Sequence, residues 1–176
     1  MRPRYVVDTN VLIAASAADP VNPRDIDATP DVPELREQVW DWLDRFQRGD
    51  SRMVLDASGR IMEEYTRKLG FNDFGIQVVM HKWSTAAVDD VDVVYDEDGS
   101  AILPTALAAL VHDGADRKMV AAALASRQVF GEGCIVFAGD TDWHDGEDGL
   151  LAHELLLEPI IEAWSRKTGC SMRRSI

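Results

Sequence analysis

The chain begins with a short β-branched segment that leads a carboxylate to the start of an alanine-rich helix. Segment 5–7 predicts a strand, Asp8 follows it, and segment 11–18 predicts a helix. A strand followed directly by a helix is typical of a parallel α/β sheet, in which ligands bind outside the carboxyl ends of the strands. Asp8 therefore lies where a ligand would bind. Aspartate also commonly caps a helix N-terminus, so both roles remain open.

The length and composition fit one α/β domain. At 176 residues and 46% hydrophobic, the chain can bury a full core but is too short for two domains of ordinary size. It has no apolar window of transmembrane length and no signal-peptide pattern. Cys134 and Cys170 show neither metal-ligand spacing nor a disulfide framework. We therefore predict a single cytoplasmic domain over residues 1–176, without a membrane partner.

Hydrophobic periodicity and turn residues predict the remaining elements. The predicted strands cover 52–56, 91–95, 133–139 and 154–157. The predicted helices cover 34–48, 58–69 with Ser58 as its cap, 76–83, 103–111, 115–127 and a last helix from Pro159. The proline-rich stretch 19–33 predicts an exposed loop, and the basic tail 167–176 predicts a frayed end.

Three further acids are candidate site residues. Segment 133–139 is continuously apolar, as an inner parallel strand would be, and Asp140 ends it as Asp8 ends the first strand. On a helical wheel Asp116 falls among apolar residues in the first turn of its helix, where it needs a cation, a helix dipole or a metal. Glu64 lies closer than Glu63 to the apolar stripe of its helix.

The charge of the chain restricts its partners. There are 18 basic and 31 acidic residues, which gives a net charge of −13 and argues against long-range attraction of nucleic acid. The acidic excess is compatible with solubility, with a basic protein partner, or with carboxylates gathered around metal ions.

Four segments together resemble the PIN-domain nucleases, a family of small cytosolic metal-dependent ribonucleases that includes many prokaryotic toxins. They are VVDTN at 6–10, RIMEEYTRKL at 60–69, DRKMVAAALA at 116–125 and AGDTDW at 138–143. The resemblance implies a three-layer α/β/α sandwich whose mostly parallel sheet of about five strands has the first strand in its centre. It also implies a ribonuclease that hydrolyses RNA phosphodiester bonds, with a protein antitoxin and a second copy of the chain as candidate partners.

The resemblance also assigns roles to individual residues. Asp8, Glu64, Asp116 and Asp140 match the catalytic acids and metal ligands of the family, Asp142 matches an accessory acid, and Asn10 matches a supporting polar residue. Oxygen ligands without Cys or His suit Mg²⁺ or Mn²⁺ better than Zn²⁺. Arg67, Arg117 and Lys118 are candidate contacts for substrate phosphates, with Arg60 and Lys68 nearby, although Lys68 is also placed to pair with Glu64.

Two other functions remain open. One is a PIN-like binding protein whose metal site is weak and whose acidic surface docks a basic protein. The other is a phosphatase with Asp8 as nucleophile, which is less favoured because segment 8–10 lacks a second aspartate two residues after the first. The histidines, His81, His112, His144 and His153, share no spacing with a nucleophile and are predicted to be structural or surface residues.

Overall fold

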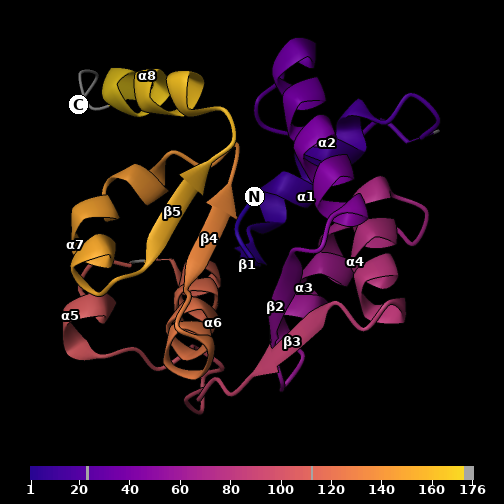
Figure 1. The fold of residues 1–176 in the computed structure, drawn as a ribbon. Coiled ribbons are helices and arrows are strands. Elements are labelled where there is room, and N and C mark those ends of the chain that lie inside the picture. Colours follow the sequence, from indigo (N-terminus) through magenta and orange to yellow (C-terminus); the bar gives the residue numbers. More distant parts are fainter. Residues whose placement is uncertain (23, 112, 173–176) are drawn as a thin grey trace.

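The computed structural model describes residues 1–22, 24–111 and 113–172 (Figure 1). Its sheet contains β1 (Arg4–Val7), β2 (Arg52–Asp56), β3 (Val88–Val91), β4 (Cys134–Phe137) and β5 (Leu156–Pro159). The strand order is β3-β2-β1-β4-β5, and each neighbouring pair is parallel. The predicted fold class and the central place of the first strand are therefore confirmed.

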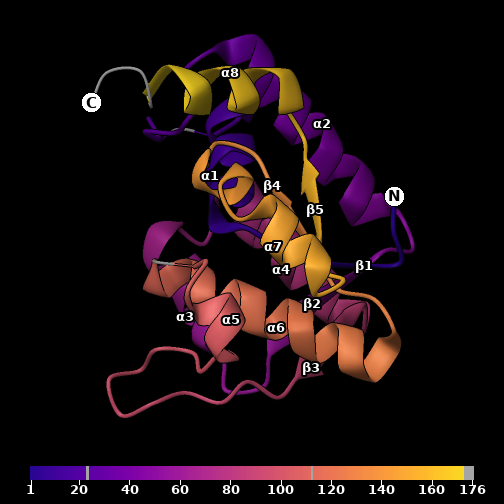
Figure 2. The same cartoon turned by 90° about the vertical axis from the view of Figure 1, so that its left-hand side faces the viewer.

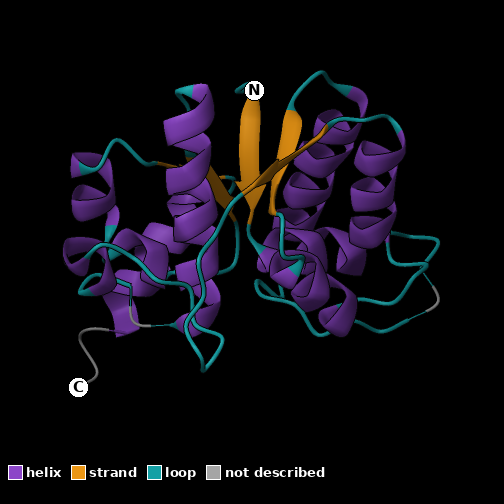
Figure 3. Ribbon diagram, turned by 90° about the horizontal axis from the view of Figure 1, so that it is seen from below, coloured by secondary structure: helices purple, strands orange, loops and turns teal. Residues whose placement is uncertain are grey.

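Helices cover both faces of the sheet (Figure 3). The elements of one face are α1 (Thr9–Ala18), α2 (Pro33–Arg48), α3 (Arg60–Lys68) and α4 (Phe74–Ser84), of which α1 packs against the other three. The long helix α6 (Gly114–Phe130) packs on β1, β2, β3 and β4. In Figure 2 the strands lie between α2 and α6, which gives the three layers of the sandwich. None of the described helices is both long enough and apolar enough to span a bilayer.

Four further elements complete the described part of the chain. They are α5 (Thr105–Ala108), the 3₁₀ turn η1 (Asp142–His144), α7 (Glu147–Ala152) and α8 (Glu162–Met172). The helix predicted at 103–111 shortens to α5, and α7 was not predicted. The last helix begins at Glu162 because Pro159 still belongs to β5, which pairs with Phe137. The tail predicted to be frayed from residue 167 is helical as far as Met172, and residues 173–176 lie outside the described residues.

Burial explains the main elements. All of β4 is buried, as its continuous apolar run requires. In α2 the residues Val39, Trp42, Leu43 and Phe46 are buried at helical spacing. The ring of Tyr5 meets Trp42 edge to face, 5.3 Å between centroids, which joins β1 to α2. Gly75 allows close packing of α4 on α1, since a Cβ there would lie 2.7 Å from the carbonyl oxygen of Leu12.

The third strand begins three residues earlier in the chain than predicted. It was expected at 91–95, but β3 occupies Val88–Val91 and pairs with β2. Asp89 is tolerated within this strand because its carboxylate accepts hydrogen bonds from Arg4 Nε and Arg52 Nε, each at 2.8 Å. An ion pair across the strands therefore overcomes the poor β propensity of aspartate.

The start of α3 also differs from the prediction. Its N-cap is Gly59 in the left-handed region, and Ser58 donates instead to the Asp56 carboxylate. Asp56 accepts the amides of Arg60 at 3.0 Å and Ile61 at 2.7 Å, so the residue that ends β2 satisfies the helix start. Burial would raise the pKa of Asp56, but these donors hold it below its ordinary value.

The described residues of the stretch 19–32 contain no helix or strand, as predicted, and Pro33 already begins α2. This stretch is nevertheless anchored at several points. Asp73 is fully buried and accepts Asn22 Nδ2 at 3.0 Å and Arg24 Nη1 at 2.6 Å. The carbonyl of Thr29 packs against Gly139, where a Cβ would lie only 2.1 Å away. The loop therefore holds the segment between β4 and Asp140 in place.

Candidate active site

Asp8 and Asp140 leave the same edge of the sheet. Asp8 directly follows β1 and Asp140 follows β4, and these neighbouring strands pair in parallel with Val7 opposite Val136. The Asp8 amide continues this pairing by donating to the Val136 carbonyl at 2.9 Å. Both carboxylates are thus at the carboxyl edge of the two inner strands, where ligands bind in such sheets.

Asp8 is a helix cap and a buried acid at once. Its Oδ1 accepts the Asn10 amide at 3.2 Å, which makes it the N-cap of α1, and its Oδ2 accepts Trp143 Nε1 at 3.2 Å. Its exposed fraction is 5%. Burial, with the charge of Asp140 next, raises the pKa of Asp8 to about 7 in spite of the two donors.

Asp116 faces the same region from the first turn of α6. Burial, followed by the charges of Asp8 and Asp140, raises its pKa to about 8. Burial also raises the pKa of Asp140, and the charge of Asp142 adds to this effect. Three carboxylates from three elements therefore repel one another in a site that water only partly reaches.

Glu64 has partners of its own. It is 7% exposed, whereas Glu63 is exposed to solvent, so the predicted register of α3 is correct. The Thr9 hydroxyl donates to one carboxylate oxygen of Glu64, and Lys118 Nζ forms an ion pair with the other. Lys118, rather than Lys68, is the cation that pairs with Glu64.

These four acids, called here the acidic cluster (Asp8, Glu64, Asp116 and Asp140), border one cavity of about 210 Å³, the acidic cavity. Asn10, Arg67 and Lys68 also line it, and so does Asp113, an acid that was not among the predicted site residues. Asp142 is exposed and lies outside this lining, although its amide donates to Asp140 at 2.9 Å.

The chemistry of the acidic cavity suits a hard divalent cation. Its acids offer only oxygen, and their mutual repulsion would be relieved by positive charge. Within the described residues, no group of three or more His, Cys, Asp and Glu side chains is arranged to hold a metal ion. The Lys118 ion pair and the Trp143 hydrogen bond use oxygens of Glu64 and Asp8 that a cation would otherwise contact.

The predicted phosphate contacts separate into different environments. Arg67 lines the acidic cavity. Arg117 instead donates to the carbonyls of Val111 at 3.0 Å and Ala108 at 3.3 Å, and so connects α6 to α5 and to the segment that follows it. Lys118 is held by Glu64. The sequence could not reveal the contacts of Arg117 and Lys118, because the groups that they bind lie on other elements.

Two other features are distinct from the acidic cluster. A larger cavity of about 530 Å³ lies between the end of α1 and the start of α2, but none of the predicted site residues lines it. His144 Nε2 lies 2.8 Å from the Ser165 hydroxyl and joins η1 to α8, which agrees with a structural role. His112 lies outside the described residues.

Comparisons of the chain with models of protein families, with curated proteins and with solved structures found no significant match. The site is therefore interpreted from its own residues.

Proposed function

We propose that this protein is a Mg²⁺- or Mn²⁺-dependent ribonuclease that hydrolyses RNA phosphodiester bonds at the acidic cluster. The observation that carries the proposal is the convergence of four acids, distant in sequence, on one cavity at the carboxyl edge of the central strands. Burying several carboxylates together is costly unless a cation neutralises them. The resemblance of segments 6–10, 60–69, 116–125 and 138–143 to PIN-domain nucleases points to the same chemistry.

Each residue of the cluster has a part in this proposal. Asp8, Asp116 and Asp140 would hold the ion, with Glu64 and Asp142 beside them. A bound divalent ion lowers the pKa of a water ligand and stabilises negative charge on phosphate oxygens. Trp143 fixes the orientation of Asp8, and Thr9 fixes that of Glu64. The proposed hydrolysis requires no Ser, Cys or His nucleophile.

The direct test is RNA cleavage by the purified full chain. We expect a mixed-sequence single-stranded RNA to be cut in Mn²⁺ or Mg²⁺ and to stay intact in EDTA. A preparation that cuts equally well in EDTA, or that cuts in neither condition, would contradict the proposal.

One observation favours a different function. Because Lys118 already neutralises Glu64, a catalytically weak fold that binds a basic protein through its acidic surface is the second candidate. The two functions differ in whether a divalent ion binds the cluster.

Metal binding should therefore stabilise the fold. A ligand of the native state alone adds about 2.7 kcal/mol at a hundredfold excess over Kd, or about 5–10 °C in Tm for a domain of this size. We expect this shift with Mn²⁺ in the wild type and little of it in Asp116→Asn, measured by thermal unfolding. Asp41→Asn, an exposed acid on α2, is the matched control and should shift as the wild type does. An equal shift in Asp116→Asn would remove Asp116 from the site.

A further inference from the structure

Arg60 and Arg67 differ from the other arginines whose side chains the structure describes. Each of those others pairs with a carboxylate or donates to a backbone carbonyl. Arg60 instead lies over the ring of Tyr95, 4.7 Å from its centroid. Arg67 forms no ion pair or hydrogen bond with another residue that the structure describes. In a chain of net charge −13, both guanidinium groups are thus free for an external anion.

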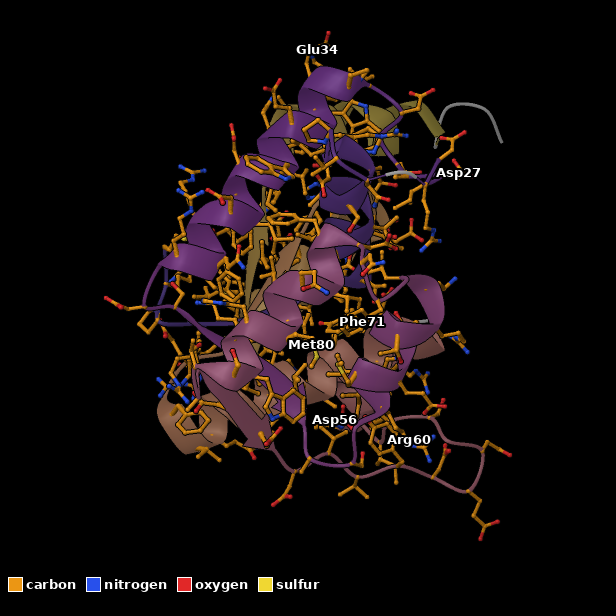
Figure 4. All side chains as sticks on the ribbon, turned by 90° about the vertical axis from the view of Figure 1, so that its right-hand side faces the viewer. Asp27, Glu34, Asp56, Arg60, Phe71 and Met80 are labelled. Carbon is orange, nitrogen blue, oxygen red and sulfur yellow. The ribbon has the colours of Figure 1, made fainter. Side chains whose placement is uncertain are left out.

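Both arginines face one cavity. They are seven residues apart on α3, which places them two turns apart on the same side of the helix. With Lys118 and Gly99 they line a cavity of about 190 Å³, the arginine cavity. Arg60 lies where the first turn of α3 meets the loop that joins β3 to α5 (Figure 4). A Cβ at Gly99 would lie 2.9 Å from Arg60 Nη1, so this glycine leaves room for the guanidinium group.

The arginine cavity adjoins the acidic cavity. Glu64 and Arg67 line both. The charge of Glu64 is paired with Lys118, and Glu63, which also lines the arginine cavity, is exposed, so that water screens its charge. An anion can therefore bind at the arginines although the acids are close.

A third cavity adjoins the acidic cavity through Asp113 and Asp116, which line both. This cavity of about 190 Å³, called here the mixed cavity, combines apolar side chains with carboxylates: it is lined by Leu110, Val111, Trp143 and Leu150 and by Asp113, Asp116, Asp142 and Asp145. The arginine cavity, the acidic cavity and the mixed cavity thus follow one another along the surface.

We propose, on the basis of the proposed nuclease function, that single-stranded RNA lies along these three cavities. Arg60 and Arg67 hold one phosphate, the next phosphate along the strand lies at the acidic cluster, and a base on the far side enters the mixed cavity. Guanidinium groups match phosphate oxygens with paired hydrogen bonds. In the mixed cavity the apolar side chains would contact the face of the base, and the carboxylates would accept hydrogen bonds from its amino groups. A base can enter this cavity only when it is unstacked, so the geometry selects single strands over duplexes.

The test measures RNA binding without metal, so that cleavage does not interfere. Fluorescence anisotropy of a labelled single-stranded RNA in EDTA would give Kd for the full chain at several salt concentrations. We expect Arg60→Gln and Arg67→Gln each to weaken binding about fivefold and to lower the slope of log K against log salt by about 0.7. Arg45→Gln removes one charge from the exposed face of α2 and is the matched control, with affinity unchanged.

Two further arms test the mixed cavity and the choice of strand. Leu110→Ala should weaken binding about threefold without changing the salt slope, because it removes apolar contact and no charge. The duplex form of the same RNA should bind more weakly than the single strand. Circular dichroism would check that each variant is folded.

The outcomes separate this proposal from the proposed function. Arginine variants that bind as well as Arg45→Gln, a duplex that binds as well as the single strand, or a wild type that does not bind RNA would each overturn the binding mode. A wild type that shows the expected binding pattern but does not cut RNA in Mn²⁺ would support the binding mode and overturn the nuclease. Metal-dependent cutting by the wild type, together with unchanged RNA affinity in the arginine variants, would support the nuclease and overturn the binding mode.

Discussion

Replacing Asp8 by asparagine should lower the rate of metal-dependent RNA cleavage by about two to four orders of magnitude. The amide keeps the size of the side chain and one oxygen acceptor for Asn10 or Trp143, but it loses the charge that attracts a metal ion. Asp116→Asn, Asp140→Asn and Glu64→Gln should show losses of the same kind. The measurement is single-turnover cleavage in excess Mn²⁺, with folding followed by circular dichroism.

Combined variants make this expectation sharper. If the acidic cluster acts as one unit, Asp8→Asn with Asp140→Asn should be little slower than the slower single variant. Independent contributions would instead multiply. Asp41→Asn controls for the loss of one acid elsewhere and should cut at the wild-type rate. Normal cleavage by Asp8→Asn would exclude the acidic cluster as a nuclease active site, because Asp8 is the most buried acid of the cluster.

The position of the acidic cluster follows from features that a sequence expresses locally. Asp8 and Asp140 each end an apolar segment, and parallel pairing of inner strands brings such ends to one edge. Helical periodicity distinguishes Glu64 from Glu63, since an apolar stripe fixes which side of α3 is buried. These inferences need only the period of the helix or strand and the direction of the sheet.

The partners of the site acids could not be predicted in the same way. Lys118 reaches Glu64 from α6 and Trp143 reaches Asp8 from η1, so each contact depends on how distant elements pack. The tryptophan left one signal, its place directly after Asp142 in a segment that resembles a nuclease motif. The position of β3 was missed for a related reason, because Asp89 is tolerated in a strand only through Arg4 and Arg52.

The raised pKa values of the site acids predict how stability depends on pH. Asp8 and Asp116 bind protons more tightly in the folded state than in the unfolded state, since their pKa values rise from 3.8 to about 7 and about 8. The folded state therefore holds more protons between about pH 4 and 8, and the free energy of unfolding falls as pH rises through this window. Asp56, Asp89 and Glu147 have lowered pKa values, so their effect is confined to more acidic solutions.

In EDTA, the free energy of unfolding of the wild type should therefore decrease from pH 5 to pH 8. The shift of Asp8 alone corresponds to a loss on the order of 3 kcal/mol between pH 5 and pH 8. Asp116→Asn should flatten this dependence, because it removes one shifted acid and the repulsion that it exerts on Asp8. Saturating Mn²⁺ should restore stability at pH 8, where the carboxylates are charged, and add little at pH 5, where protons already neutralise them. Urea unfolding at both pH values, with and without Mn²⁺, measures all of these changes. If the free energy of unfolding in EDTA stays level or rises from pH 5 to pH 8, the acids do not repel one another as their burial implies.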